Sequence, residues 1–197
     1  MRKVLQTILI PVLCMLPLLS FAQNGEARLS NESKLSINGK SNVNDFKCES
    51  EHEFQQDSLD FSYHFEADTI NVNGVSLFLE ISRFDCGKKA INRDFRNTLK
   101  YKNHPFIKIT LNELILKTKD NPIPTTANVI ITIAGVERNY DVPLHAFLST
   151  EDGVLVGGNK ILYMSDFGLT PPSPLFGLVQ VRDELDIVFE LVVRFDS

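Results

Sequence analysis

The chain has 197 residues, of which 43% are hydrophobic and 23% are charged, and its formal net charge is -5 at pH 7. This balance is typical of one globular domain and argues against a largely disordered chain or a protein with several membrane spans. The acidic charge excludes a broad basic surface for nucleic-acid phosphates, so we expect no nucleic-acid partner. The three Cys and four His lack zinc-finger spacing, and the sequence predicts no metal site and no cofactor.

Residues 1–22 have the layout of a signal peptide. The basic pair Arg2 and Lys3 precedes an apolar run, and Ala22 and the serine two positions before it supply the small residues that a signal peptidase needs. The run contains two prolines and is short for a bilayer span, which takes roughly 20 residues. We predict cleavage near Ala22, a mature domain of residues 23–197, and a periplasmic or secreted location. An uncleaved anchor is the alternative.

Export would change both the charge and the redox setting of the chain. Residues 1–22 contain two basic groups and no acidic ones, so the mature charge would be -7. That charge suits a soluble protein and opposes contact with an anionic membrane surface, so we expect no stable membrane insertion. Cys48 and Cys86 would remain in a compartment that can be oxidising; they form either a disulfide or two buried thiols. The oligomeric state is left open, with a homodimer among the alternatives.

Apolar and polar residues alternate with a period of two over most of the mature chain, which predicts antiparallel strands with one buried face. The alternation is clearest at residues 58–66, 75–82, 107–112, 129–133, 140–146 and 185–195. Asn73-Gly74 and Ala134-Gly135 predict hairpins between such runs. Asn38-Gly39 and Gly157-Gly158 predict further turns, and residues 120–126, with two prolines, predict an exposed loop.

Residues 88–101 have helical periodicity instead. Ile91, Phe95 and Leu99 recur at every fourth position and form one apolar stripe over about three turns. Pro105 then starts the next strand. About eight antiparallel strands and one short helix form either a sandwich or a barrel, and the pattern alone does not choose between them. A barrel of about eight strands holds either side chains or one small ligand.

Motifs for catalysis are sparse. Asp166-Phe167-Gly168 has the letters of a kinase motif, but the chain has no glycine-rich phosphate loop, so we interpret it as a turn near a strand end. A G-x-S-x-G nucleophile elbow is also absent from the sequence. His64 and His145 occupy polar strand faces, where solvated side chains are the expectation. The sequence therefore predicts no catalytic residues and no enzyme activity.

Four stretches carry a family resemblance, and they span nearly all of the mature chain. In order they are residues 35–46, residues 92–99 followed by the strand start at 104–109, residues 129–144, and residues 164–169 with the segments 171–172 and 181–187. Together they resemble the YceI-like family of exported lipid-binding proteins. The resemblance implies an all-β, lipocalin-like antiparallel barrel with one short helix. It also implies binding of a long isoprenoid chain, such as a polyprenyl or quinone tail, rather than catalysis.

An isoprenoid tail has no polar atoms to satisfy, so a dry channel of aliphatic and aromatic side chains is enough to hold it. Burial of each five-carbon unit contributes roughly 3–4 kcal/mol before costs are counted. We predict that one parity of the strands lines this channel, with these residues: Phe61, Tyr63, Phe65, Leu77, Leu79, Ile107, Ile109, Ile131, Ile133, Phe189 and Leu191.

The turn that contains Phe167 and Leu169 and the loop at 171–175 are predicted parts of the channel mouth. The competing interpretation is a barrel filled by its own side chains. In that case the protein is a structural or interaction module, and its exterior binds a protein partner through an edge strand or the 120–126 segment.

Overall fold

The computed structural model describes residues 22–54, 58–118, 121–150 and 153–196, so the predicted signal peptide lies almost entirely outside the described residues. The described chain is mainly antiparallel β-structure with one α-helix. Its elements are β1 (Gln23–Leu29), β2 (Lys34–Ser41), β3 (Asp45–Ser50), β4 (Ser58–Glu66), β5 (Thr69–Asn73), β6 (Ser76–Glu80), the 3-10 turn η2 (Ile81–Arg83), β7 (Phe84–Asp85), α1 (Lys89–Thr98), β8 (Phe106–Thr118), β9 (Asn121–Ile133), β10 (Val136–Thr150), β11 (Gly153–Tyr163), the 3-10 turn η3 (Met164–Phe167) and β12 (Val181–Asp196).

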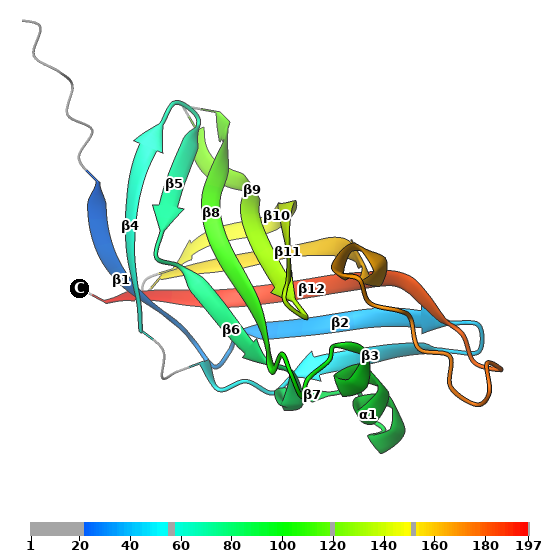
Figure 1. Cartoon of the computed structure of the whole chain (residues 1–197). Helices are drawn as coiled ribbons and strands as arrows, with labels where there is room; N and C mark the ends of the chain where they lie inside the picture. The colour runs from blue at the N-terminus through cyan, green and yellow to red at the C-terminus, as the bar shows by residue number, and fades with distance from the viewer. Residues whose placement is uncertain (1–21, 55–57, 119–120, 151–152, 197) are drawn as a thin grey trace, which may run out of the picture.

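Eight strands close into a ring. Their order is β1-β4-β5-β8-β9-β10-β11-β12, and β12 pairs back onto β1. Neighbouring strands pair in antiparallel fashion throughout the ring. The prediction of an antiparallel barrel with about eight strands and one short helix is therefore confirmed (Figure 1).

Two long strands change partners along their length and so give the barrel two different ends. Residues 193–196 of β12 pair with β1, whereas residues 181–190 pair with β2. In β8, residues 113–115 pair with β5, whereas residues 106–110 pair with β6. We call the end with β1, β4 and β5 the β4–β5 end. The opposite end, with β2, β3, β6, β7, α1 and η3, is the helix end (Figure 1).

The helix α1 lies where the apolar stripe predicted it. It spans Lys89–Thr98, and Leu99 follows as its C-terminal cap. Its start is fixed by Asn92, which accepts a hydrogen bond from the Cys86 amide at 2.6 Å through its side-chain oxygen. Cys86 is joined to Cys48 of β3 by a disulfide, with the two sulfurs 1.96 Å apart. The helix is thus tied to the barrel directly before its first turn.

One predicted hairpin is confirmed and one is wrong. Ala134-Gly135 joins β9 to β10, with Ile133 paired to Val136. Asn73-Gly74 does not form a hairpin, because β5 and β6 both pair with β8 in one continuing antiparallel direction. They are two pieces of a single interrupted strand, and Gly74, at φ 94°, makes the kink between them.

Three further turn and loop predictions are wrong, because each of these segments is part of a strand. Asn38-Gly39 lies within β2, and Gly157-Gly158 lies within β11. An aromatic ring occupies the place where a side chain would project from the glycine: a Cβ on Gly158 would lie 2.8 Å from the Phe189 ring. Residues 121–126 continue β9, which pairs with β8, so the part of the predicted loop that the structure describes is strand.

Candidate functional site

The interior of the barrel is lined by alternate residues of each strand, and register shifts after Leu111 in β8 and after Leu144 in β10 interrupt the alternation. Along residues 127–133 of β9 the buried residues are Ala127, Val129, Ile131 and Ile133, and the residues between them are only partly buried. Cross-strand partners share a face, so Tyr140 and its neighbours on β10 continue the same surface. The inner wall thus follows the alternation seen in the sequence.

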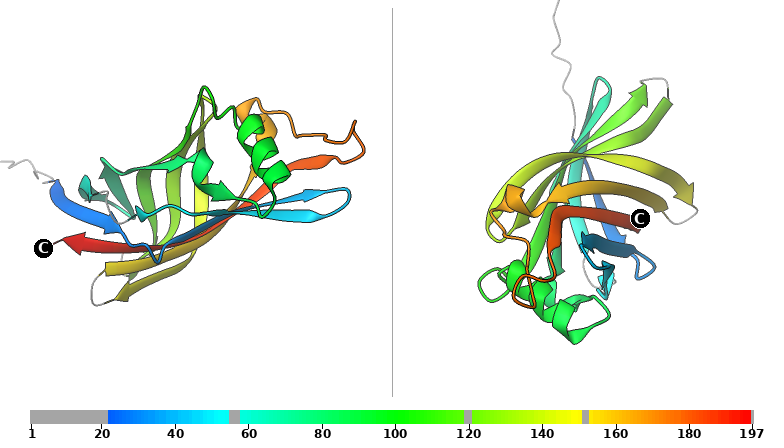
Figure 2. Two further views of the ribbon diagram at one scale, coloured as in Figure 1. Left: turned by 90° about the horizontal axis from the view of Figure 1, so that it is seen from below. Right: turned by 90° about the vertical axis from the view of Figure 1, so that its right-hand side faces the viewer.

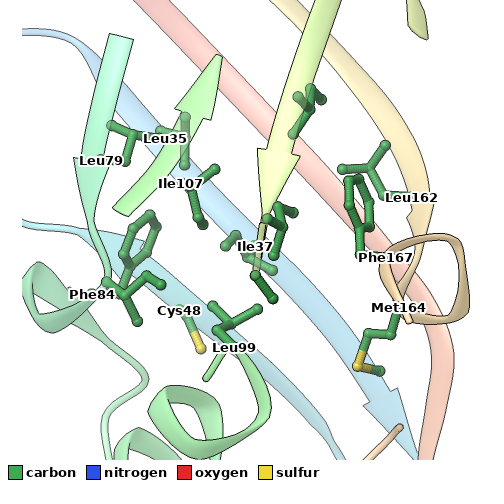
Figure 3. Packing of buried hydrophobic residues seen from close by; sticks show 14 of the residues in the cluster. Leu35, Ile37, Cys48, Leu79, Phe84, Leu99, Ile107, Leu162, Met164 and Phe167 are labelled. Carbon is green, nitrogen blue, oxygen red and sulfur yellow. The ribbon is translucent and has the colours of Figure 1, made fainter. Parts of the chain in front are cut away.

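The helix end encloses an apolar cavity of about 60 Å³. Side chains from β2, β6, β8, β9, β11 and β12 form its walls, and α1 and η3 close it (Figure 3). Phe95 and Leu99 face it from α1, and Met164 and Phe167 face it from η3. Leu79 and Phe167 are each 1% exposed, so most of this end of the interior is shielded from water, and Tyr163 at its edge is 45% exposed.

The turn η3 covers a gap in the wall. The β10–β11 ladder begins only at Leu144 and Gly158, so the first half of β10 separates from the end of β11. Two contacts hold η3 over this gap. Tyr140 of β10 donates its hydroxyl hydrogen to the Asp166 carboxylate at 2.8 Å. The Ser165 amide donates to the Asp183 carboxylate of β12, also at 2.8 Å.

The Tyr140–Asp166 contact changes the acidity of the phenol. Partial burial and the hydrogen bond to the nearby Asp166 carboxylate together raise the pKa of Tyr140 to about 12. Lys160 Nζ lies 5.6 Å from the centre of the same ring and donates to the Asp141 carbonyl at 2.9 Å. The polar groups at this edge of the interior therefore have partners, and the cavity beside them remains apolar.

The β4–β5 end is lined by aromatic rings and is not sealed. Phe61, Tyr63 and Phe65 stand on the inner face of β4, with neighbouring ring centres 6.0 and 5.9 Å apart. Phe61 also meets Phe195 at 6.4 Å. A Cβ on Gly25 would lie 2.6 Å from the Phe61 ring, so this ring leans over the neighbouring strand. Phe65 and Phe195 are 56% and 52% exposed.

Within the described residues, His52 and the two cysteines form no nucleophile–base pair. His52 is half-buried between Ser50, whose hydroxyl lies 2.6 Å from Nδ1, and the Glu80 amide, which donates to Nε2 at 2.6 Å. Burial first, and the Arg83 charge second, lower the pKa of His52. Cys48, the thiol nearest to it in sequence, is held in the disulfide. No group of three or more His, Cys, Asp or Glu among the described residues could hold a metal ion.

Solved structures with the same architecture exist, although no family model and no curated protein matches the chain. A polyisoprenoid-binding domain from Saccharophagus degradans matches with a TM-score of 0.58 at 11% identity, over 86% of this chain and 98% of that one. BcnA from Burkholderia cenocepacia matches with a TM-score of 0.56 at 19% identity, over 82% of this chain and 96% of that one. The chain has a YceI-like barrel fold. The Campylobacter jejuni YCEI protein matches at 17% identity over 70% of this chain and 82% of that one, with a TM-score of 0.46.

The YceI-like barrel distributes the predicted site residues over both ends. Those that line the enclosed cavity are Leu79, Ile107, Ile109, Ile131, Ile133, Phe167 and Leu169. Leu77, Phe189 and Leu191 are partly buried and pack against the same core. Phe61, Tyr63 and Phe65 lie at the β4–β5 end, away from the cavity.

One part of the predicted mouth is wrong. Phe167 and Leu169 were expected at a rim, but they are 1% and 5% exposed and close the sealed end of the cavity. The reason is that η3 folds inward over the gap between β10 and β11. The 171–175 loop lies at the same end of the molecule, and its Leu175 is exposed.

Several lining residues were missed by the sequence analysis. They are Leu35, Ile37, Phe84, Phe95, Leu99, Leu162, Tyr163, Met164, Leu185 and Ile187. The alternation of apolar and polar residues at 35–37 and 185–187 could have identified four of them as inward-facing. The helical stripe identified Phe95 and Leu99 as buried, but it could not say against what.

No described helix of the YceI-like barrel is long and apolar enough to cross a membrane.

Proposed function

We propose that this YceI-like barrel binds a long apolar lipid, a polyisoprenoid or an isoprenoid quinone tail, inside the barrel, and that it does so without catalysis. The observation that carries the proposal is the apolar interior, which has a buried cluster around the cavity at the helix end and a row of aromatic rings on β4 at the other end. The fold shared with a domain described as polyisoprenoid-binding supports the same ligand class.

The enclosed cavity is smaller than such a ligand. It measures about 60 Å³, whereas an apolar cavity that admits benzene measures about 150 Å³. A chain that reaches the helix end must therefore push side chains aside. The element suited to move is η3, because side-chain contacts to Tyr140 and Asp183 hold it rather than a strand ladder, whereas α1 is anchored by the Cys48–Cys86 disulfide. Each buried isoprene unit contributes roughly 3–4 kcal/mol toward that rearrangement.

We place the polar head group at the β4–β5 end. Phe65 and Phe195 are open to solvent there, and the Tyr63 hydroxyl donates to the Gln23 side chain at 2.5 Å. A tail threaded from this end would pass Phe61 before it reaches the sealed cavity. If residues 1–22 are removed on export, the barrel would carry or store lipid in the aqueous space outside the cytoplasm.

The test compares retention of a defined probe, a nonaprenol, by purified protein and two variants. Phe61→Ser changes the inner wall where the tail would enter, and we expect it to reduce bound nonaprenol several-fold. Phe78→Ser is the control, because it makes the same substitution on the outer face of β6, where Phe78 is 55% exposed. Equal retention by both variants, with both still folded, would contradict the assigned interior.

The alternative, a filled barrel that binds a protein partner through its exterior, is favoured by one observation. The cavity volume of about 60 Å³ leaves little room inside. Under this alternative the wild-type protein takes up no nonaprenol, and Phe61→Ser changes only the free energy of unfolding.

A further inference from the structure

The positive charge of the chain is concentrated at the helix end. Residues 88–102 contain six Lys or Arg and one Asp, whereas the rest of the chain contains 14 basic and 24 acidic residues. Within α1, Lys89 and Arg93 are four positions apart and form an exposed stripe, away from the side on which Phe95 faces the cavity. The net charge of the whole chain therefore does not describe this surface.

The basic stripe borders an open depression on the surface. Lys89, Arg93, Arg96, Lys100 and Lys102 all line it, together with three asparagines and Tyr101. Arg93 has Asp94 as a neighbour at 3.5 Å, and Arg96 donates to the Ser82 carbonyl at 3.0 Å. The remaining three lysines extend into solvent, so an anionic surface would meet mostly unshielded ammonium groups.

An exposed apolar tip lies at the same end of the molecule. It consists of Val43, in the β2–β3 turn, and Leu175, Phe176 and Leu178, in the loop before β12, and Phe176 is fully exposed. Isolated exposed apolar residues are ordinary, but four in one contiguous tip are not. Figures 1 and 2 show this loop, the β2–β3 turn and α1 together at the end opposite the C-terminus.

The tip is held in place. Asn42 donates to the Leu178 carbonyl at 3.0 Å and accepts from the Gln180 amide at 2.8 Å, so the turn and the loop are fastened together. Leu175 and Phe176 have φ values of 55° and 56°, in the left-handed region that residues other than glycine rarely adopt. The backbone thus holds strain in a conformation that leaves the Phe176 ring in solvent.

Charges close to the tip nearly balance. The flanking strands contain two basic residues, Lys40 and Arg182, and three acidic ones, Asp45, Asp183 and Glu184. The Asp183 carboxylate also accepts a hydrogen bond from the Ser165 amide of η3. The excess positive charge at this end therefore comes from α1 and the residues that follow it. An apolar tip and a basic stripe at the same end of the molecule match the two layers of a membrane surface, in which anionic head groups overlie acyl chains.

We propose that the helix end docks onto a bilayer that contains anionic lipids, with the ring of Phe176 entering the interface and the basic stripe of α1 on the head-group phosphates. This docking is peripheral and requires no membrane insertion of the barrel. It is opposite to the expectation, drawn from the net charge, that anionic membranes repel the protein. The docking goes beyond the proposed lipid binding and is tested without any isoprenoid.

The experiment measures flotation of the protein with vesicles of phosphatidylcholine alone and with vesicles containing about one-third phosphatidylglycerol at low salt. We expect binding to the anionic vesicles only, and its loss at high salt. Lys89→Gln with Arg93→Gln should weaken binding about 25-fold, given the contribution of each basic residue near an anionic surface. Phe176→Ser should weaken it about tenfold, because less apolar surface leaves water.

Matched controls come from the rest of the barrel. Lys34→Gln with Lys117→Gln removes the same charge, and Leu148→Ser removes an exposed apolar side chain from β10. Both controls should bind as the wild type does. The proposal is overturned if wild-type protein ignores anionic vesicles, if the controls weaken binding as much as the tip and stripe variants, or if Phe176→Ser converts a dimer into a monomer in light scattering.

Discussion

The two ends of the barrel are built from the same alternating strands, yet their inner side chains differ in burial. At the helix end Leu79 and Phe167 are each 1% exposed, whereas at the β4–β5 end Phe65 is 56% exposed. The difference comes from α1 and η3, which cover one end only. Inner-facing residues at the helix end are core, whereas at the β4–β5 end buried residues such as Ala27 and Val72 share the inner face with the exposed ring of Phe65.

The comparison assigns different tasks to the two ends. The helix end holds the chain together, through its sealed apolar core and the Cys48–Cys86 disulfide. The β4–β5 end offers apolar surface that water now covers and that a ligand could cover instead. Truncations at the helix end should therefore cost the most free energy of unfolding, whereas truncations at the β4–β5 end should reduce ligand retention with little loss of stability.

The largest effect is expected from the disulfide of the helix end. The bond closes a segment with a sequence separation of 38 residues, so its loss should lower the free energy of unfolding by about 3–4 kcal/mol by freeing the unfolded chain. Urea unfolding of protein lacking residues 1–22, with and without Cys48→Ala and Cys86→Ala, measures this. Two free thiols in the unreduced, denatured protein would contradict the bond.

Truncation at the two ends gives the second test. Leu79→Ala should cost about 3 kcal/mol, because it removes a fully buried side chain and leaves a cavity. Phe65→Ala should cost less than about 1 kcal/mol, because more than half of that side chain is already in water. Urea unfolding of both variants compares them directly, and equal losses would mean that the ends do not differ.

Removal of a single oxygen atom should weaken the closure of the helix end by η3. Tyr140→Phe removes the hydroxyl that donates to Asp166 and should cost about 1 kcal/mol. The pKa of Tyr140 is raised to about 12 in the folded protein, above its ordinary value of about 10. Its stabilising contribution is complete below pH 10 and is lost as the pH rises from there toward 12.

Thermal melts across this alkaline range should show a steeper loss of stability in the wild type than in Tyr140→Phe. Parallel profiles for the two proteins would show that the hydroxyl does not hold η3. Because other tyrosines and lysines also titrate there, the informative quantity is the difference between the two profiles.

The smallest effect concerns His52, beside the β6–β7 corner. Burial lowers the pKa of His52, and its Nε2 accepts the Glu80 amide hydrogen, which a protonated ring could not do. The stabilising contribution of the neutral ring is therefore present above its unfolded pKa and is lost as the pH falls through the lowered folded value. His52→Phe should make stability less dependent on pH in this acidic range. An unchanged dependence would contradict the assignment.

The alternation predicted antiparallel strands and the inner parity of most of them, because burial of one face imposes a period of two whatever the neighbours are. The choice of a barrel over a sandwich came from the family resemblance, not from the alternation. The sequence analysis failed where tertiary contacts override local preference. Gly157-Gly158 looks like a turn, but the Phe189 ring occupies the space above Gly158 inside a strand. Asn73-Gly74 looks like a hairpin, but β8 is long enough to pair with both flanking strands.

The candidate site was predictable only in part for the same reason. Alternation identified Ile107 and Ile131 as inward-facing, yet it could not distinguish them from Phe65, which has the same parity at the other end. The cover of the helix end depends on where α1 and η3 dock, and local periodicity does not contain that information. Met164 and Leu162 were therefore missed, and Phe167 was expected at a rim.

The most direct test of lipid binding is mass spectrometry of the intact protein, purified from its native host without detergent and kept folded during ionisation. The account predicts one isoprenoid chain for each barrel, released on denaturation and depleted in Phe61→Ser but not in Phe78→Ser. A folded barrel that carries only its own mass, and that still carries only its own mass after incubation with nonaprenol, would contradict it.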